Sequence, residues 1–398
     1  MRFVTFRRRP VGREGELGAQ AAQQPDAGRR GDPTEPLAQA GATQQPDAGW
    51  TGAPTEPGAP QLGVLLDTDR DGRGGRVLPL AVLPGLAGDP GWTRAIGDGD
   101  LAALLAADPD LAATRQALEA LGPEAARALA IDRMAVRLLA PVMHPSKIVC
   151  VGQNYADHIR EQGIPFPDRP SIFAKFANAV AGDGDPVVRH DATNALDLEA
   201  ELAVVIGRRA SRVPASKAMD HVAGYTVVND ISARDLQGMA PAVRPGEHGD
   251  GQWLRAKGSD SFLPMGPALV TADEIPDPHG LVIRSWRTAA GARLGEAAGG
   301  TLGEPFLMQD STSAELVFRI PALIEFISAV ITLEPGDVIP TGTPPGVGNF
   351  RNPPIYLEPG DVASCYVEGI GRIDNPIVAS DGSAPPGSPA EAILNERA

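Results

Sequence analysis

The sequence predicts a mainly β fold of the α+β class, in which a small β-rich N-terminal domain that carries helices precedes a larger mixed β domain. Between residues 146 and 380, many short β-type runs are separated by Gly-Pro and Pro-Gly-Asp turns, which is typical of mixed or antiparallel sheets. Strand and helix patterns do not alternate there, which argues against a doubly wound or barrel design of parallel strands. Helical spacing is concentrated before residue 140.

The N-terminal domain is predicted to begin with two paired strands. Met1 to Phe6 alternates as a strand does, and Gln61 to Asp67 is its natural continuation. Between them, at about residues 10–60, lies a Pro-, Gln- and Ala-rich insert in which Gln-Gln-Pro-Asp-Ala-Gly occurs at Gln23 and again at Gln44. Because aromatic and β-branched residues are scarce in it, we expect a mobile insert.

The rest of this domain is predicted to be helical. The Ala- and Leu-rich segment from Asp98 to Leu139 has helical spacing, with Asp98 or Asp100 as the capping residue and Gly122-Pro123 as a break. We therefore predict an N-terminal domain over residues 1–140 and a second domain over residues 146–380. Residues 381–398 are small, polar and proline-containing, so we expect a flexible tail.

Composition excludes several classes of partner. A chain of 398 residues with 42% hydrophobic residues can bury a real core. A formal charge of −15 and a pI near 4.9 argue against nucleic acid and anionic membranes as partners. The apolar stretch from Val77 to Leu86 is short and interrupted by prolines, so we expect no membrane span. Two cysteines, Cys150 and Cys365, are too few for a disulfide framework, which favours the reducing cytoplasm.

Three carboxylates lie at the ends of two β-type runs. Side chains at positions i and i+2 of a strand share a face, so Glu199 and Glu201 point the same way. A second run, Tyr225 to Val228, ends just before Asp230. A divalent cation with oxygen ligands would relieve the repulsion between these charges. Ion pairs with arginines such as Arg208 at a solvated strand edge are the alternative.

A short helix offers a candidate base. Asn154 is placed to cap a helix that Gly163 ends, and His158 and Glu161 would share one of its faces. A carboxylate beside an imidazole fixes its tautomer and raises its basicity, which suits a general base. A solvated helix with an ordinary histidine and glutamate is the alternative.

Seven motifs in one order give the sequence a family resemblance. From about Lys147 to Val378 the chain resembles the fumarylacetoacetate hydrolase (FAH) family, in its smaller metal-dependent branch of acylpyruvases, oxaloacetate decarboxylases and hydroxydienoate isomerases. The motifs are Cys-Val-Gly-Gln-Asn-Tyr-Ala-Asp-His from Cys150, Glu199-x-Glu201, Asn229 to Gln237, Gly-Gln-Trp253 with Lys257, Pro335-Gly-Asp-Val, Thr341 to Gly348, and Glu368-Gly-Ile-Gly371.

The resemblance implies a fold and a cofactor. It implies an FAH-type mixed β-sandwich or roll as catalytic domain, and a homodimer. It also implies Mg²⁺ or Mn²⁺ on Glu199, Glu201 and Asp230, where the ion chelates a small 2-oxo carboxylic acid. True fumarylacetoacetases carry a fourth acidic ligand seven residues before the histidine, where this chain has Val151. A three-ligand site therefore fits the smaller branch.

The resemblance also implies roles for further residues. His158 with Glu161 corresponds to the family's catalytic dyad, and Lys257 to a lysine that faces the substrate oxygens and stabilises negative charge. The turn after Thr341 exposes amides that can hold a carboxylate. Arg234 and Gln237 either touch the substrate or hold the loop together. The residues that we assign to substrate binding are Asn154, Arg234, Gln237, Gly342 and Thr343.

The expected function is a metal-dependent hydrolase of C–C bonds in ketonic substances. His158 would deprotonate a water that attacks the distal carbonyl of an acylpyruvate or related β-diketo acid. The alternative, which uses the same residues, is a decarboxylase or isomerase of oxaloacetate-like or hydroxydienoate acids, including one that acts in a biosynthetic pathway. Because Ala256 and Ser259 depart from the family pattern, a binding protein without turnover is a third hypothesis.

Overall fold

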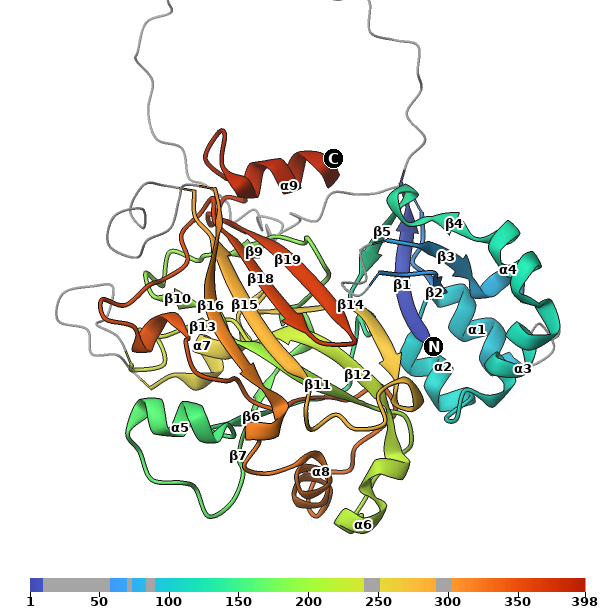
Figure 1. Cartoon of the computed structure of the whole chain (residues 1–398), viewed down its shortest axis with the longest axis horizontal. Coiled ribbons are helices and arrows are strands. Elements are labelled where there is room, and N and C mark those ends of the chain that lie inside the picture. The colour runs from blue at the N-terminus through green and yellow to red at the C-terminus, as the bar shows by residue number, and fades with distance from the viewer. Residues whose placement is uncertain (10–57, 70–73, 84–89, 240–250, 291–302, 398) are drawn as a thin grey trace, which may run out of the picture.

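The chain is organised around one large sheet (Figure 1). The structure, a computed structural model, describes residues 1–9, 58–69, 74–83, 90–239, 251–290 and 303–397. Within these ranges the sheet has twelve strands in the order β4-β3-β2-β1-β14-β12-β11-β17-β6-β7, with β5 also paired to β1 and β8 to β14. The strands are β1 (Arg2–Arg8), β2 (Gln61–Leu66), β3 (Arg76–Pro79), β4 (Ile131–Asp132), β5 (Val136–Leu139), β6 (Ile148–Gly152), β7 (Ser171–Lys175), β8 (Val180–Ala181), β11 (Ala200–Ile206), β12 (Val222–Asn229), β14 (Leu263–Thr271) and β17 (Val338–Pro340).

A second sheet packs against the first. Its order is β16-β15-β18-β19-β9, and β10 pairs separately with β13. Leu202 and Val204 of β11 belong to a core cluster that includes Cys365 of the second sheet, whereas Ala203 and Val205 belong to the cluster on the opposite face. The central strand is thus covered on both faces, and the predicted mixed β-sandwich is confirmed. The strands are β9 (Val187–Val188), β10 (Leu196–Asp197), β13 (Ser232–Ala233), β15 (Val282–Thr288), β16 (Pro305–Thr312), β18 (Val362–Val367) and β19 (Gly371–Val378).

The N-terminal strands pair as predicted, because β1 is antiparallel to β2. β1 also pairs with β14, so the N-terminal strands extend the large sheet. The division into domains at residues 140–146 therefore stays a prediction. The insert predicted at about residues 10–60 lies almost wholly outside the described residues.

Four helices gather beside these strands (Figure 1). The Asp100 carboxylate caps α2 by accepting from the amides of Ala102 (2.9 Å) and Ala103 (3.2 Å). Gly122 separates the third and fourth helices, as predicted. The helical prediction to Leu139 is wrong at its end, because Val136–Leu139 forms β5 against β1. The helices are α1 (Pro90–Asp98), α2 (Leu101–Ala107), α3 (Ala112–Leu121) and α4 (Pro123–Leu129).

The tail predicted to be flexible contains a helix, α9 (Pro389–Arg397). Arg397 Nη1 lies 2.6 Å from Asp185 Oδ1, so an ion pair ties this helix to the body of the chain. In the described ranges, no helix is long and apolar enough to cross a membrane. The remaining helices are α5 (Ala156–Gln162), α6 (Ala215–Ala218), α7 (Trp253–Gly258) and α8 (Ile320–Ser328).

Candidate active site and metal centre

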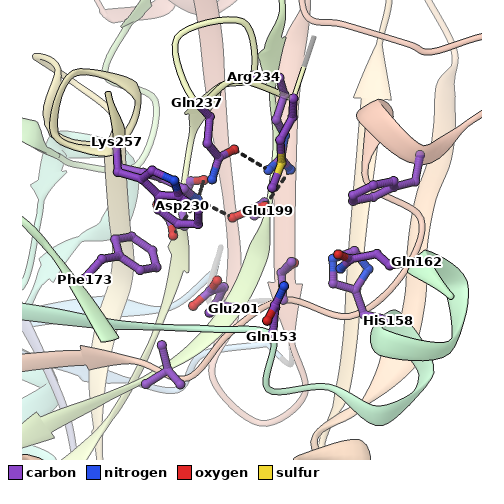
Figure 2. A pocket seen from close by; sticks show the side chains of 16 residues that line it. Gln153, His158, Gln162, Phe173, Glu199, Glu201, Asp230, Arg234, Gln237 and Lys257 are labelled. Carbon is purple, nitrogen blue, oxygen red and sulfur yellow. Dashed lines mark hydrogen bonds and ion pairs between the residues drawn. The ribbon is translucent and has the colours of Figure 1, made fainter. Parts of the chain in front are cut away.

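A pocket opens where β11 and β12 approach α5 and α7 (Figure 2). His158 and Gln162 reach it from α5, and Lys257 reaches it from α7 on the opposite side. The pocket is lined by Val151, Gly152, Gln153, His158, Gln162, Phe173, Glu199, Glu201, Asp230, Arg234, Gln237, Met239, Trp253, Lys257, Thr343 and Phe350.

The three predicted carboxylates meet at the bottom of this pocket. Glu199 precedes β11, Glu201 lies within it, and Asp230 follows β12. The amide of Asp230 donates to the Glu199 carbonyl (2.9 Å), which fixes the two residues side by side. One carboxylate oxygen from each residue lies within 4.8 Å of the others, and all three residues are buried. The geometry therefore brings together the oxygen donors that a hard divalent cation prefers.

Two cations compensate Glu199. Its carboxylate accepts from Arg234 Nη2 (2.5 Å) and Lys257 Nζ (2.6 Å). Burial acts to raise the pKa of Glu199, but Arg234 and Lys257 outweigh it and hold that pKa well below its usual range. Burial likewise acts to lower the pKa of Lys257, and Asp230 and Glu199 raise it overall. These groups are charged at neutral pH.

Glu201 is compensated much less. It accepts one hydrogen bond, from the amide of Gly342 (2.8 Å), and in the described ranges it forms no ion pair with a basic side chain. Burial, Asp230 and Glu199 raise the pKa of Glu201 well above its usual range. A buried acidic group held this way favours either a proton or a cation. The donor set and this weakly compensated carboxylate both fit a divalent metal ion.

His158 and Glu161 form a hydrogen-bonded pair at the side of the pocket. Nδ1 of His158 lies 2.7 Å from Glu161 Oε2, and Glu161 Oε1 accepts from the amide of Gly346 (3.0 Å). The ring of Phe350 packs edge-on against His158, with 5.5 Å between centroids. Because Glu161 engages Nδ1, Nε2 is the ring nitrogen available to take a proton.

The helix that carries the pair is tied down at its start and ends at a glycine. Asp157 accepts from the Ser311 hydroxyl, which ties α5 to β16. Gly163 ends the helix in the left-handed region, with φ 65°, as predicted. The predicted cap is wrong, because Tyr155 occupies the N-cap position.

Asn154 makes other bonds and lies outside the pocket lining. Its side chain donates to the carbonyls of Phe318 (3.1 Å) and Thr341 (2.9 Å) and accepts from the amide of Phe318 (2.8 Å). These bonds use both N–H donors of the amide and one acceptor position of its oxygen. Its structural role is to hold the start of α5 against the turn after β17.

The other residues predicted to contact substrate are Arg234, Gln237, Gly342 and Thr343. Arg234 lines the pocket and bridges Asp197 (2.9 Å), Glu199 and Gln237 (3.0 Å), so its guanidinium group holds these side chains in place. The amide of Gly342 donates to the Glu201 carboxylate, and the Thr343 hydroxyl donates to the Ala200 carbonyl (3.1 Å).

Gln237 and Thr343 line the pocket, and Gly342 does not. The φ of Gly342 is 99°, and a Cβ there would lie 3.1 Å from the Val151 carbonyl oxygen, so backbone strain and close packing both favour glycine at this turn.

Two residues at the site, Lys175 and Gln153, were assigned no role in the sequence analysis. Lys175, fully buried, donates to the carbonyls of Ile231 (3.0 Å) and Phe262 (2.7 Å) and lies 2.8 Å from Asp230 Oδ1. Burial lowers the pKa of Lys175 despite Asp230. A lysine directly after the apolar residues Ile172, Phe173 and Ala174 was the available signal. Gln153 also lines the pocket, with a left-handed φ of 52°, which is uncommon for a residue other than glycine.

Comparison with known proteins places this site in a family. The fumarylacetoacetate (FAA) hydrolase C-terminal domain matches residues 147–378. The mitochondrial oxaloacetate tautomerase fahd2 of Xenopus laevis is 45% identical over 248 residues, covering 62% of this chain and 70% of that protein. The mitochondrial oxaloacetate tautomerase FAHD2A of Homo sapiens is 44% identical over 268 residues, covering 67% and 76%.

Two solved structures extend the likeness. The 2-hydroxyhepta-2,4-diene-1,7-dioate isomerase of Mycobacterium marinum is 38% identical, with a TM-score of 0.50, covering 63% of this chain and 81% of that one. The fumarylacetoacetate hydrolase of Exiguobacterium antarcticum is 30% identical, with a TM-score of 0.60, covering 81% and 97%. The family match covers more than half of the sequence, and its limits agree with the predicted ones. The chain belongs to the fumarylacetoacetate hydrolase family.

Proposed function

We propose that this chain is a divalent-metal-dependent enzyme that transfers a proton on a small 2-oxo carboxylic acid, as a tautomerase or isomerase. The observation that carries the proposal is the His158–Glu161 pair beside the three buried carboxylates in one pocket. The names of the relatives, oxaloacetate tautomerases and a hydroxydienoate isomerase, support proton transfer as the reaction.

Each residue has a distinct part in this reaction. A Mg²⁺ or Mn²⁺ ion on Glu199, Glu201 and Asp230 would supply Lewis-acid polarisation of the 2-oxo group. Nε2 of His158 takes a proton from C3, the C3–H electron pair forms a C2–C3 double bond, and negative charge moves to the 2-oxo oxygen. Lys257 stabilises that charge. His158 then returns the proton to oxygen, which gives the enol, or to a more distant carbon of a conjugated acid, which gives an isomer.

Hydrolysis of a C–C bond is the second candidate. The similarity to a fumarylacetoacetate hydrolase over 97% of its length favours it. Here His158 takes a proton from water, hydroxide adds to the C4 carbonyl of a 2,4-dioxo acid, and the C3–C4 bond breaks. The products are a carboxylic acid and an enolate, which the same histidine protonates.

One assay separates the candidates and tests the dyad. A 2,4-dioxo acid is followed by enol absorbance and by product analysis, with wild type, His158→Gln and the surface control His221→Gln. Tautomerisation changes the absorbance and yields no pyruvate, whereas hydrolysis releases pyruvate. We expect His158→Gln to lose 100-fold or more, on the order of a general base's contribution, and His221→Gln to match wild type. Equal rates for His158→Gln and wild type would reject His158 as the base.

The homodimer, the cytoplasmic setting and the choice of Mg²⁺ or Mn²⁺ stay predictions. Sedimentation of the purified chain tests the first. Replacing each metal in turn in the assay tests the last.

A further inference from the structure

We infer that the substrate carries one carboxylate, at its 2-oxo end, and an uncharged apolar group at its other end. This inference rests on the proposed function, because it assumes that the 2-oxo acid is held at the three carboxylates. It concerns the outer half of the pocket, which that function leaves open.

The first support is that the pocket's cations are already used. In the described part of the lining, the cationic side chains are Arg234 and Lys257, with His158 as a titratable neighbour. Arg234 is paired with Asp197 and Glu199, and Lys257 is paired with Glu199 and Asp230. His158 is paired with Glu161. A second substrate carboxylate would meet no spare positive charge among these groups.

Formal charges lead to the same conclusion. Four carboxylates lie with three cationic groups at the bottom of the site, and one divalent ion would leave a single positive charge. The carboxylate at the 2-oxo end neutralises that charge, and Glu161 adds a further negative one beside His158. A second buried carboxylate would therefore be uncompensated, which is unfavourable at low dielectric. The groups counted are Asp197, Glu199, Glu201, Asp230, Lys175, Arg234 and Lys257.

The second support is the apolar wall of the outer pocket. Met239 and Trp253 line it although they are 42% and 41% exposed. Phe173 packs edge-on against Trp253, with 5.4 Å between centroids, and lies on the Lys257 side of the pocket (Figure 2). Phe350 continues the wall beside His158. Exposed aromatic and methionine side chains at a pocket mouth are typical of surface that an apolar ligand covers.

The third support is the kind of polar group found there. Gln153 and Gln162 line the pocket, and both are uncharged (Figure 2). An amide can bind a carbonyl or hydroxyl of the substrate without favouring a charged one. The pocket thus combines an ionic inner end with a neutral outer end, which suits an alkyl- or aryl-substituted 2-oxo acid.

A matched pair of substrates tests the inference. 2,4-Dioxoheptanoate and 2,4-dioxoheptanedioate share the 2-oxo end and chain length, and differ only in a terminal methyl or carboxylate. We expect kcat/KM to be higher for the methyl-ended acid by about tenfold or more, the range of an uncompensated polar group in an apolar pocket. A preference for the dicarboxylate, or for oxaloacetate over both, would overturn the inference and leave the proposed function standing.

A binding experiment keeps the test independent of turnover. N-propyloxamate and N-(2-carboxyethyl)oxamate carry the same 2-oxo carboxylate head, and calorimetric titration of the Mg²⁺-loaded protein compares their tails. Tighter binding of the propyl compound supports the inference, whereas equal or weaker binding overturns it. If neither oxamate binds and neither dioxo acid reacts, the proposed function fails together with the inference.

Three variants locate the effect. Met239→Arg supplies a cation and should shift the preference toward the carboxylate-ended compounds by about tenfold. Trp253→Ala should weaken binding of the propyl compound more than that of the carboxylate compound. Leu254→Ala is the matched control, since Leu254 lies on the same helix, is 58% exposed and is not part of the lining. A preference that Met239→Arg leaves unchanged would contradict the assigned position of the tail.

Discussion

Glu201→Gln should stabilise the metal-free protein although it removes a proposed metal ligand. Glu201 is 1% exposed and lies within 4.8 Å of two other carboxylates. At that distance and an effective dielectric constant of about 20, two unit charges repel by about 3.5 kcal/mol. Lys257 offsets part of this repulsion. We therefore expect glutamine, whose amide oxygen can still accept from Gly342, to raise the free energy of unfolding by about 1–3 kcal/mol.

Glu199→Gln is the matched control and should have the opposite effect. Glu199 compensates Arg234 and Lys257, so its loss leaves two buried cations with one partner fewer. Breaking such a pair is expected to lower the free energy of unfolding by about 3–5 kcal/mol.

The assay is equilibrium urea denaturation at neutral pH, in EDTA and in millimolar Mg²⁺. In EDTA, Glu201→Gln should unfold at higher urea than wild type, and Glu199→Gln at lower urea. In Mg²⁺, wild type should gain stability and Glu201→Gln should gain little, since ligand binding to the folded state stabilises it. A large loss of stability for Glu201→Gln in EDTA would refute the charge argument.

Three further predictions follow from the same contacts. The pKa of Glu201 is raised in the folded, metal-free protein. The stability linked to this group is therefore fully present below the pKa of Glu201 in the unfolded chain, and it is lost as pH rises through the pKa in the folded protein. The advantage of Glu201→Gln in EDTA should thus grow from acid to neutral pH, and an advantage that shrinks would contradict this sign. Glu161→Gln should lower kcat by about 100-fold with little change in oxamate affinity, because Glu161 acts on Nδ1 of His158. A loss of oxamate affinity instead would indicate that Glu161 contacts the substrate. Leu104 is fully buried in α2, so Leu104→Ala should lower the free energy of unfolding by about 2–5 kcal/mol and leave kcat of the folded protein unchanged. Urea denaturation measures this loss, and a loss under about 1 kcal/mol would contradict the packing of α2.

The fold class and the carboxylate cluster follow from local patterns. Alternation in β11 and β12 set which side chains share a face, and the pairing of Ala200 with Asn229 brings the ends of these strands together. The i, i+2 rule correctly predicted that Glu199 and Glu201 lie together. Glu199 is nevertheless just outside the strand, because β11 begins at Ala200. The Asp230 amide bond to the Glu199 carbonyl supplies the alignment that a continuous strand would have given.

The residues that the sequence analysis misplaced or missed have partners far away in the chain. An asparagine before a helix resembles a cap locally, but Asn154 finds its partners at Phe318 and Thr341. The function of Lys175 depends on Asp230 and on carbonyls of other segments. Local propensity carries no information about such contacts. The same reason explains the tail, because α9 contacts Asp185 through Arg397.

The most direct test of the account is anomalous diffraction from crystals of the full chain soaked with Mn²⁺ and oxalate. The account predicts an anomalous peak within about 2.0–2.6 Å of carboxylate oxygens from Glu199, Glu201 and Asp230, the range for hard divalent cations, with oxalate on its open side. A Mn²⁺-soaked crystal with no peak among these three side chains would contradict it.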